Sequence, residues 1–458
     1  MVLIGLEIHG YLMVENKKKL FCNCSLEEAE PNTNICPICT GQPGAKPMLP
    51  NKEAVEKVLA IALMLGCKVN DSLVFQRKHY DWPDLPKGFQ ITMSGSYALP
   101  VGVDGSFLGV GIQQVHLEED PARWNPDTGE VDYNRSGYPL VEIVTKPDLK
   151  SAEHVREWLR KLWTLLGYIR AVDRKLGVKC DVNVNIEGHP RVEVKNVNSF
   201  SAIVEVVKHE VERQKNAVKK GVVLKQETRA WTGEKTVFMR FKEQAEDYRF
   251  IPEPDLPVIK ISKQWLQSIK SKLPETPDQK LEKMQRLGVN AVDAQIISSD
   301  IILADLWEFL TSKGFPSQRA ANFVRHWFLR VVNDEGLYPE DFKGSKLQVF
   351  KVLKLFVDKK ISDKTANQLL AKLVKQDFDV EAFVREQSLT VINDEEIVKK
   401  YCEQVLEQEK KAVNDYLKGN EKVIHYLKGR VMRLSKGKAD QQLVEELLRS
   451  MLKALREV

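Results

Sequence analysis

Residues 178–197 read VKCDVNVNIEGHPRVEVKNV, and this stretch decides how the first half of the chain folds. Apolar and polar side chains alternate from Val178 to Ile186 and again from Arg191 to Val197. A period of two is typical of β-strands with one buried face. Gly188-His189-Pro190 between the two runs indicates a turn, so we expect the strands to pair antiparallel. That pairing gives the hairpin one polar face, made of Asp181, Asn183, Asn185, Glu193 and Lys195.

The rest of the first 260 residues continues this pattern. Residues 4–9 (IGLEIH) alternate in the same way and place Glu7 and His9 on one face of another strand. Three helices are expected among the strands. They are Lys52 to Leu65, capped by Asn51 and stopped by Gly66; a helix that begins at Ser151; and one that begins at Ser201 and ends near Gly221. The sequence therefore predicts an α+β domain over residues 1–260, with a mixed or antiparallel sheet.

The second half has a different composition. Three prolines between Ile251 and Pro257 indicate a stiff exit from the first domain, and Thr276-Pro277 is a strong helix start. We expect an all-α helical domain over residues 261–390 and a small α-helical tail domain over residues 391–458.

Composition limits the class of protein. The chain has 458 residues, of which 43% are hydrophobic and 29% charged, as in globular proteins. The longest uncharged apolar run, Val58 to Cys67, falls short of the roughly 20 residues that cross a bilayer. The N-terminus has no secretory signal pattern, so a cytoplasmic location is expected. The formal net charge of +5 permits a nucleic-acid partner without requiring one.

Four of the seven cysteines crowd into one short segment, residues 22–39. Cys22 and Cys24 form one close pair, and Cys36 and Cys39 form another. Two such pairs can supply four thiolates to a tetrahedral zinc ion. Because four protein ligands leave no open position, such a zinc would be structural. The alternative is four cysteines that lie near one another without binding metal.

Acidic side chains gather on three strand-like segments. They are the segment of Glu7 and His9, residues 116–120 (HLEED), and the polar face of the hairpin. Carboxylates together with histidine suit Mg²⁺ or Mn²⁺. An ordinary solvated strand face is the alternative, and spacing alone leaves both open. The sequence has no P-loop, no His-Glu-x-x-His and no Gly-x-Ser-x-Gly, which excludes those nucleotide, metalloprotease and hydrolase sites.

The tail has a local excess of positive charge. Between Leu417 and Lys438 seven basic residues stand against one acid, Glu421. Such a basic helix face suits a phosphate backbone, although a plain solvated helix is the alternative. The basic residues are Lys418, Lys422, Lys428, Arg430, Arg433, Lys436 and Lys438.

Several stretches, in order along the first 257 residues, resemble the B-subunit family of glutamyl/aspartyl-tRNA amidotransferases. These are GLEIH (5–9), RKHY (77–80), PDLPKG (83–88), HLEED (116–120), DYNRSG (132–137), PLVEIV (139–144), EVKNVNSF (193–200), QETR (226–229) and DYRFIPEPDLP (247–257). The helical half resembles the family more loosely, through residues 419–422, GRVM (429–432) and KGKA (436–439).

This resemblance implies a catalytic cradle domain, a helical domain and a mobile tail that touches tRNA. The cradle is expected to be a kinase that uses ATP to phosphorylate the side-chain carboxylate of Glu-tRNA(Gln) or Asp-tRNA(Asn). Ammonia from a separate amidase, the A subunit, then displaces phosphate, and a small C subunit is expected to complete the complex. The whole is a carbon–nitrogen ligase with glutamine as the amido donor. The sequence has no amidase signature of its own.

The resemblance also implies roles for individual residues. Glu7, His9, Glu119, Asp181 and Glu193 would hold Mg²⁺. Strict alternation puts Glu119 with Val115 and Leu117, so Glu118 is the alternative ligand and a candidate catalytic residue. Lys78 and Lys87 are candidates for cationic help to phosphate or the acyl group, or else surface lysines.

Some family members lack the cysteine set, so zinc is not expected to be essential to the chemistry.

The notion of a B subunit that acts as a kinase has two alternatives. A related archaeal, glutamate-specific protein has a large insertion, for which the segment from Pro257 to Thr276 leaves no room. A non-catalytic tRNA-binding scaffold is the alternative outside the enzyme class.

Overall fold

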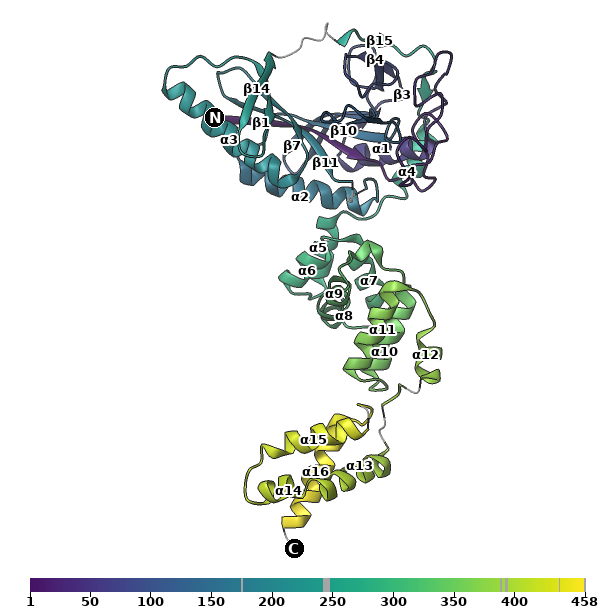
Figure 1. Cartoon of the computed structure of the whole chain (residues 1–458), viewed down its shortest axis with the longest axis vertical. Helices are drawn as coiled ribbons and strands as arrows, with labels where there is room; N and C mark the ends of the chain where they lie inside the picture. The colour runs from purple at the N-terminus through teal and green to yellow at the C-terminus, as the bar shows by residue number, and fades with distance from the viewer. Residues whose placement is uncertain (174–175, 242–247, 388, 392–393, 436, 457–458) are drawn as a thin grey trace. The chain divides into compact units, whose positions relative to one another are not determined.

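The computed structural model describes the chain except for residues 174–175, 242–247, 388, 392–393, 436 and 457–458. Its contacts divide into two compact units, Met1–Pro277 and Asp278–Val458. The first unit combines a sheet with helices, and the second is helical, which confirms the predicted fold class (Figure 1). The predicted division at residues 260 and 390 remains a prediction.

A nine-stranded mixed sheet forms the centre of the first unit, in the order β14-β13-β12-β11-β1-β10-β7-β6-β2. Among its described strands, β12 and β13 pair parallel and the other neighbours pair antiparallel. Its strands are β1 (Val2–Tyr11), β2 (Lys68–Val69), β6 (Gly102–Phe107), β7 (Val110–Glu119), β10 (Pro139–Thr145), β11 (Val178–Ile186), β12 (Val192–Val197), β13 (Glu227–Trp231) and β14 (Thr236–Phe241).

The two faces of this sheet differ sharply in chemistry. On one face Ile8 of β1 lies opposite Cys180 of β11 and Ile143 of β10, and all three are buried in the core. The other face carries the alternate residues of the same strands, among them Glu7, His9, Glu142 and Asp181. The register of β11 and β12, with Asn183 opposite Glu193, confirms the predicted polar face of the hairpin.

Helices cover the apolar face. They are α1 (Lys52–Met64), α2 (Ala152–Tyr168), α3 (Phe200–Lys219) and α4 (Lys263–Lys270), and their apolar residues share one core with the sheet. Figure 1 shows α2 and α3 along one side of the sheet.

The helix ends follow their capping residues. Asn51 caps α1, and Gly66 after it has a φ of +66°, a conformation that glycine adopts at little cost. Ser151 caps α2, as predicted. The prediction for the third helix was wrong at its start: Ser199, not Ser201, is the cap, because its Oγ accepts the backbone N–H of Ala202 at 3.2 Å.

Short strands complete the first unit. They are β3 (Ser72–Leu73), β4 (Gln76–His79), β5 (Phe89–Thr92), β8 (Arg123–Trp124), β9 (Val131–Asp132), β15 (Ile251–Pro252) and β16 (Ile259–Lys260). A three-stranded sheet, β15-β4-β5, brings β5 against the end of β7. The segment after Pro257 stays in this unit, since Ile261 and Ile269 belong to its core.

The second unit is built from helices. Its first part holds α5 (Pro277–Arg286), α6 (Ala291–Ile297), α7 (Ile301–Ser312), α8 (Ser317–Phe323), the π-helix η2 (Val324–Phe328), α9 (Leu329–Asp334), the 3₁₀ turn η3 (Pro339–Asp341), α10 (Lys346–Val357), α11 (Asp363–Lys375) and α12 (Val380–Glu386). The last four helices are α13 (Glu395–Gln408), α14 (Lys410–Leu417), α15 (Val423–Leu434) and α16 (Gln441–Arg456). These four enclose a core of their own, which includes Val398, Leu427 and Leu448. Within the described part of the chain, every helix is too short or too polar to cross a bilayer.

Candidate metal centres on the polar face of the sheet

Three carboxylates from neighbouring strands meet on the polar face. Glu7 of β1 lies opposite Asp181 of β11, and Glu193 comes from β12. One oxygen of each lies within 4.8 Å of the others. The side chain of Lys195 offsets part of this charge, with its Nζ 2.6 Å from Asp181 Oδ2 and 3.5 Å from Glu193 Oε1. We call Glu7, Asp181 and Glu193 the first carboxylate group.

The electrostatics of this group favour a bound cation. Burial raises the pKa of Glu7, and the negative charges of Glu142, Asp181 and Glu193 raise it further. Burial opposes the charged form of Lys195, but Asp181 and Glu193 outweigh it and raise the pKa of the ammonium group. A cation placed among these oxygens would relieve the repulsion that Lys195 alone does not balance.

A neighbouring amide adds a neutral oxygen to the group. Asn183 donates its Nδ2 to Glu7 Oε1 at 3.0 Å. Its Oδ1 is buried and has no hydrogen-bond partner among the described residues. A buried acceptor without a partner costs free energy, so the position calls for a ligand that this oxygen can bind. Carboxylates plus an amide oxygen are the donor set that Mg²⁺ prefers, and the residues fit that ion.

A second group lies beside the first. His9 is two residues beyond Glu7 on β1, and its Nε2 is 3.9 Å from Glu118 Oε2 and 3.8 Å from Glu142 Oε1. Both carboxylates are buried. Glu118 accepts hydrogen bonds from Thr92 and Gln90 of β5. We call His9, Glu118 and Glu142 the second carboxylate group.

The carboxylates of the second group are held in different states. Burial and the charge of Glu142 raise the pKa of Glu118. Burial acts in the same direction on the pKa of Glu142. The charge and hydrogen bond of His116 outweigh it and lower that pKa below its ordinary value, since His116 Nδ1 is 2.7 Å from Glu142 Oε2. His116 therefore favours the charged form of Glu142 and orients its carboxylate.

The structure brings Glu118, and not Glu119, into this group. Glu119 forms an ion pair with Lys87 and accepts the backbone N–H of Ile91 at 3.0 Å. The reason is the alternation along β7, which places Glu118 on the same side as His116. The charge of Lys78 reaches Glu118 and Glu142, and its Nζ stacks 4.7 Å from the ring centroid of Tyr248. Lys78 and Lys87 thus both lie at the edge of the second group.

The four clustered cysteines also meet. Cys39 Sγ is 3.9 Å from Cys36 Sγ and 4.0 Å from Cys24 Sγ, and Cys22 completes the set. Sulfurs bound to one zinc ion at about 2.3 Å in a tetrahedron would stand about 3.8 Å apart. A hydrogen bond from Cys22 lowers the pKa of Cys39 to about 4. The buried Lys19 adds to this effect, with its Nζ 3.4 Å from Cys39 Sγ. The four residues are compatible with a structural zinc.

Comparison with known proteins places the chain in a family. Residues 2–267 match the family model of the GatB/GatE catalytic domain, and residues 305–452 match that of the GatB domain. The chain is 44% identical to the B subunit of the aspartyl/glutamyl-tRNA(Asn/Gln) amidotransferase of Methanocaldococcus jannaschii, over 98% of this chain and 97% of that protein. The chain belongs to the GatB family. Proteins of the same name from Methanococcus aeolicus and Methanopyrus kandleri are 41% and 40% identical to it, each over 98% of both chains.

Membership in the GatB family confirms the resemblance seen in the sequence. The relatives that the chain matches are named as B subunits of an aspartyl/glutamyl-tRNA(Asn/Gln) amidotransferase, so each of those proteins is one subunit of a larger enzyme.

Sequence reasoning missed one residue of the site, Glu142. A signal was present, because Glu142 is the one charged residue in the run PLVEIV, residues 139–144. A carboxylate in the middle of an apolar strand is rarely buried without a partner. The register supplies two, since Glu142 lies opposite His9 and opposite His116.

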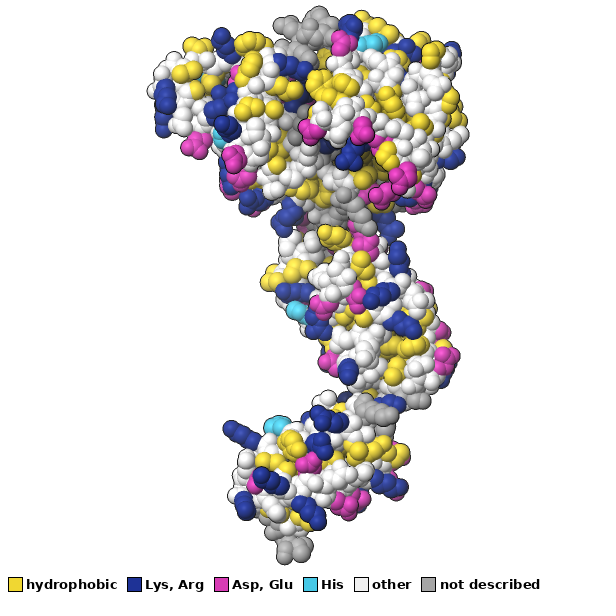
Figure 2. Space-filling view, in the orientation of Figure 1, with side chains coloured by type: hydrophobic (Ala, Val, Ile, Leu, Met, Phe, Trp, Pro, Cys, Tyr) yellow, Lys and Arg dark blue, Asp and Glu magenta, His cyan; other side chains and the backbone are white. Residues whose placement is uncertain are grey.

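The basic residues predicted in the tail of this GatB-family chain lie between α14 and α15, within α15, and in the segment after α15. Lys418, Lys422 and Arg433 are exposed. Two others are engaged within the tail: Lys428 lies 3.0 Å from Glu445, and Arg430 lies 2.6 Å from Glu409. Lys438 is half-buried after α15, and Lys436 lies outside the described residues. Figure 2 shows Lys and Arg side chains spread over the tail helices, with acidic side chains among them.

Proposed function

We propose that this chain is the kinase component of a cytoplasmic tRNA-dependent amidotransferase. In this proposal it transfers the γ-phosphoryl group of ATP to the side-chain carboxylate of Glu-tRNA(Gln), Asp-tRNA(Asn) or both. Ammonia released by a separate amidase subunit then replaces the phosphate, and the same complex contains a small C subunit. The name of the relatives, as aspartyl/glutamyl-tRNA(Asn/Gln) amidotransferase components, supports this substrate class.

One observation carries the proposal: two carboxylate groups lie next to each other on one polar face. Glu7 belongs to the first group and His9 to the second, and both point from β1 to the same side. Their Cα atoms are two residues apart, which in a strand is about 6.6 Å. Mg²⁺ held by such groups would neutralise the negative charge of ATP and the substrate carboxylate and hold the phosphates.

The reaction needs no nucleophile from the protein. An oxygen of the substrate carboxylate attacks the γ-phosphorus, the bond to the bridging oxygen breaks, and ADP leaves. Ammonia next attacks the acyl carbon, and phosphate leaves with the C–O bond electrons. The work of the chain is therefore positioning and charge stabilisation.

The side chains around the two groups suit that work. Lys78 and Lys87 can pair with phosphate or acyl oxygens, because both ammonium groups already stand beside acidic side chains at the edge of the second group. Lys195 and His116 hold the carboxylates of Asp181 and Glu142 in place through short contacts. Glu118, whose pKa is raised, is the candidate for a proton-carrying role, and Glu119 holds Lys87.

Two peripheral features complete the proposal. A structural zinc held by Cys22, Cys24, Cys36 and Cys39 would cross-link residues 22–39. The basic residues between Lys418 and Lys438 would bind the tRNA backbone through charge and without reading sequence.

The test is formation of acyl phosphate on mischarged tRNA. The complete complex would be incubated with γ-labelled ATP, Mg²⁺ and Glu-tRNA(Gln) or Asp-tRNA(Asn), and label on the tRNA would be measured. We expect labelling that requires both Mg²⁺ and the mischarged tRNA, and its near loss in Glu193→Gln. A matched control is Glu282→Gln, which removes one exposed carboxylate on α5. Full labelling in Glu193→Gln would identify the polar face as a solvated surface and favour the scaffold alternative.

A further inference from the structure

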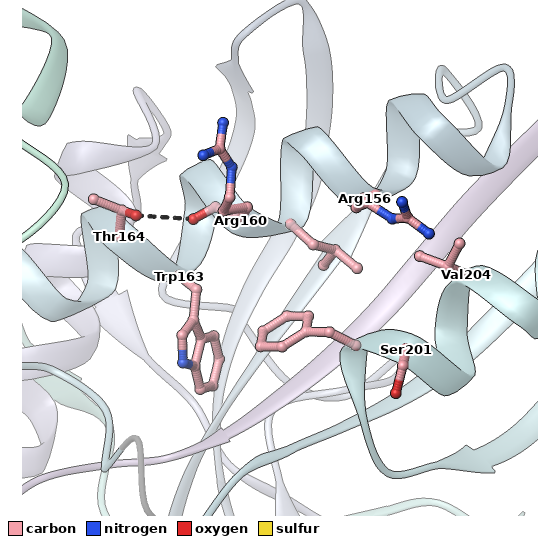
Figure 3. A pocket seen from close by; sticks show the side chains of 8 residues that line it. Arg156, Arg160, Trp163, Thr164, Ser201 and Val204 are labelled. Atoms are coloured by element: carbon pink, nitrogen blue, oxygen red, sulfur yellow. Dashed lines mark hydrogen bonds between the residues drawn. The ribbon is translucent and has the colours of Figure 1, made fainter. Parts of the chain in front are cut away.

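A groove lies on the helical side of the first unit, away from both carboxylate groups. One end is a cavity of about 450 Å³ between α2 and the start of α3. Its apolar lining consists of Leu159, Trp163, Phe200 and Val204. Figure 3 shows Trp163 on α2 facing the start of α3, where Ser201 and Val204 lie.

A second hollow of about 480 Å³ lies along the same pair of helices, between the start of α2 and the later turns of α3. We call the two hollows together the groove. Ala152 lines the second hollow and Thr164 lines the first. These residues are twelve positions apart on α2, which is about 18 Å of helix, or about three helical turns.

The rim of the groove is strongly basic. Six basic and two acidic residues line the two hollows: Lys150, Arg156, Arg160, Lys208, Lys215 and Lys219 against Glu153 and Glu212. Arg156 and Arg160 stand one turn apart on α2, both are exposed, and neither takes part in an ion pair within the described residues. Two unpaired guanidinium groups beside an apolar cavity are suited to carboxylates next to an apolar side chain.

We propose that this groove is the docking site for an acidic amphipathic helix of a partner protein chain. An apolar side chain of that helix enters between Trp163 and Val204, and its carboxylates pair with Arg156 and Arg160. This is the helix-in-groove mode, in which apolar side chains at helical spacing anchor one face of the partner. The inference rests on the family's implied partner subunits and is independent of the proposed kinase reaction.

A nucleic acid is a poorer match for the cavity. Trp163 and Phe200 pack edge to face, with ring centroids 5.2 Å apart and an interplanar angle of 77°. Trp163 is only 9% exposed. The ring of Trp163 therefore offers no open face on which a base could stack.

A small polar metabolite is also a poorer match. Such a ligand needs several convergent polar groups. Here the hydroxyl of Thr164 donates to the carbonyl of Arg160 at 3.0 Å, and that of Ser201 is hydrogen-bonded to Ser199. The guanidinium groups are left as the polar anchors of the first hollow.

The experiment compares the full chain alone with the complex that it forms with its co-expressed partner subunits, without ATP or tRNA. Hydrogen exchange is followed by mass spectrometry over residues 152–168 and 200–219. We expect exchange there to slow by about tenfold or more in the complex, because a docked helix suppresses local opening. Unchanged exchange in the complex would overturn the proposal. So would slowing that requires added tRNA, or slowing in the isolated chain as its concentration rises, since these would identify a nucleic acid or a second copy as the occupant.

A charge-reversal variant gives the second readout. Arg156→Glu combined with Arg160→Glu should weaken the affinity for the partner subunits by about tenfold or more, because the carboxylates of the docked helix would meet like charges. Lys270→Glu combined with Lys272→Glu, an exposed pair in and after α4, changes the net charge equally outside the groove. Equal affinities for the two variants would refute the docking site. Because binding is measured without substrates, this result is separate from the test of kinase activity.

Discussion

Replacing Asp181 by Asn should leave the metal-free protein almost as stable as before while weakening divalent-metal binding severely. The change keeps the shape of the side chain and removes one negative charge from the first carboxylate group. Asp181 lies within 4.8 Å of Glu7 and Glu193, and 2.6 Å from Lys195 Nζ. The same charge therefore takes part in two repulsions and one attraction.

These opposing interactions nearly cancel. With an effective dielectric constant of about 20, each repulsion over about 4.8 Å is about 3.5 kcal/mol, so the substitution relieves about 7 kcal/mol. In the same approximation the lost attraction to Lys195 is about 6 kcal/mol. The net effect on the free energy of unfolding without metal is thus about 1 kcal/mol. When metal is bound, no such cancellation exists. Loss of a residue that only supports a metal ligand lowers the metal affinity by about 10–100-fold, so loss of a ligand itself should lower it by at least about 100-fold.

The assay has two arms. Urea denaturation without divalent metal compares the free energy of unfolding of Asp181→Asn with that of the unaltered protein. Titration with Mn²⁺, followed by the electron paramagnetic resonance signal of the free ion, compares affinity. Glu282→Gln serves as the control for loss of one carboxylate. Unchanged Mn²⁺ affinity in Asp181→Asn would show that the first carboxylate group does not hold metal, and a metal-free loss of several kcal/mol would show that the cancellation argument is wrong.

Three further predictions address the remaining features. Cys36→Ser should remove about one zinc per chain and lower the melting temperature more than it lowers kinase turnover at low temperature, because zinc binding contributes to folding. Metal analysis of carefully purified protein checks this, and finding no zinc in the unaltered protein would contradict it. Truncation after residue 390 should weaken tRNA binding and make it less dependent on salt. If Lys418, Lys422 and Arg433 contact phosphates, the slope of log affinity against log salt concentration should fall in magnitude by about two to three. Affinity measured over a salt series tests this, and unchanged affinity would mean that the basic helix face is only solvated. Glu142→Gln should nearly abolish acyl-phosphate formation, because it removes the charge that His116 orients beside His9; normal formation in this variant would exclude the second carboxylate group from the reaction.

The sequence alone predicted β1, β11 and β12, which carry the first carboxylate group and His9, because alternation is a local property. Glu7, His9, Asp181 and Glu193 could be assigned to polar faces from their own segments. Which segments lie side by side depends on sheet order. β1 lies between β11 and β10 through pairings that join residues at least 129 positions apart. Glu142 entered the site only through that order.

The wrong start predicted for α3 has a tertiary origin. Ser199 and Ser201 are both good caps locally, but Phe200 packs against Trp163 of α2, a contact that no local pattern contains. Glu118 and Glu119 are chemically equal and both contact β5, and their positions along β7 place them on opposite faces of the strand. Alternation already favoured Glu118, and the packing of β5 agrees with it.

The arrangement of the sheet explains how one small region can hold so many buried charges. Every second residue of β1 faces the helices, and Ile4, Leu6 and Ile8 are at most 1% exposed there. That face supplies the apolar burial on which the fold depends, at roughly 25 cal/mol for each Å² removed from water. The opposite face is then free to hold carboxylates whose mutual repulsion is unfavourable until a cation binds. Burial, and after it the charges of Glu142, Asp181 and Glu193, raise the pKa of Glu7. The same burial and repulsion would favour a cation among these oxygens, as the proposed function requires.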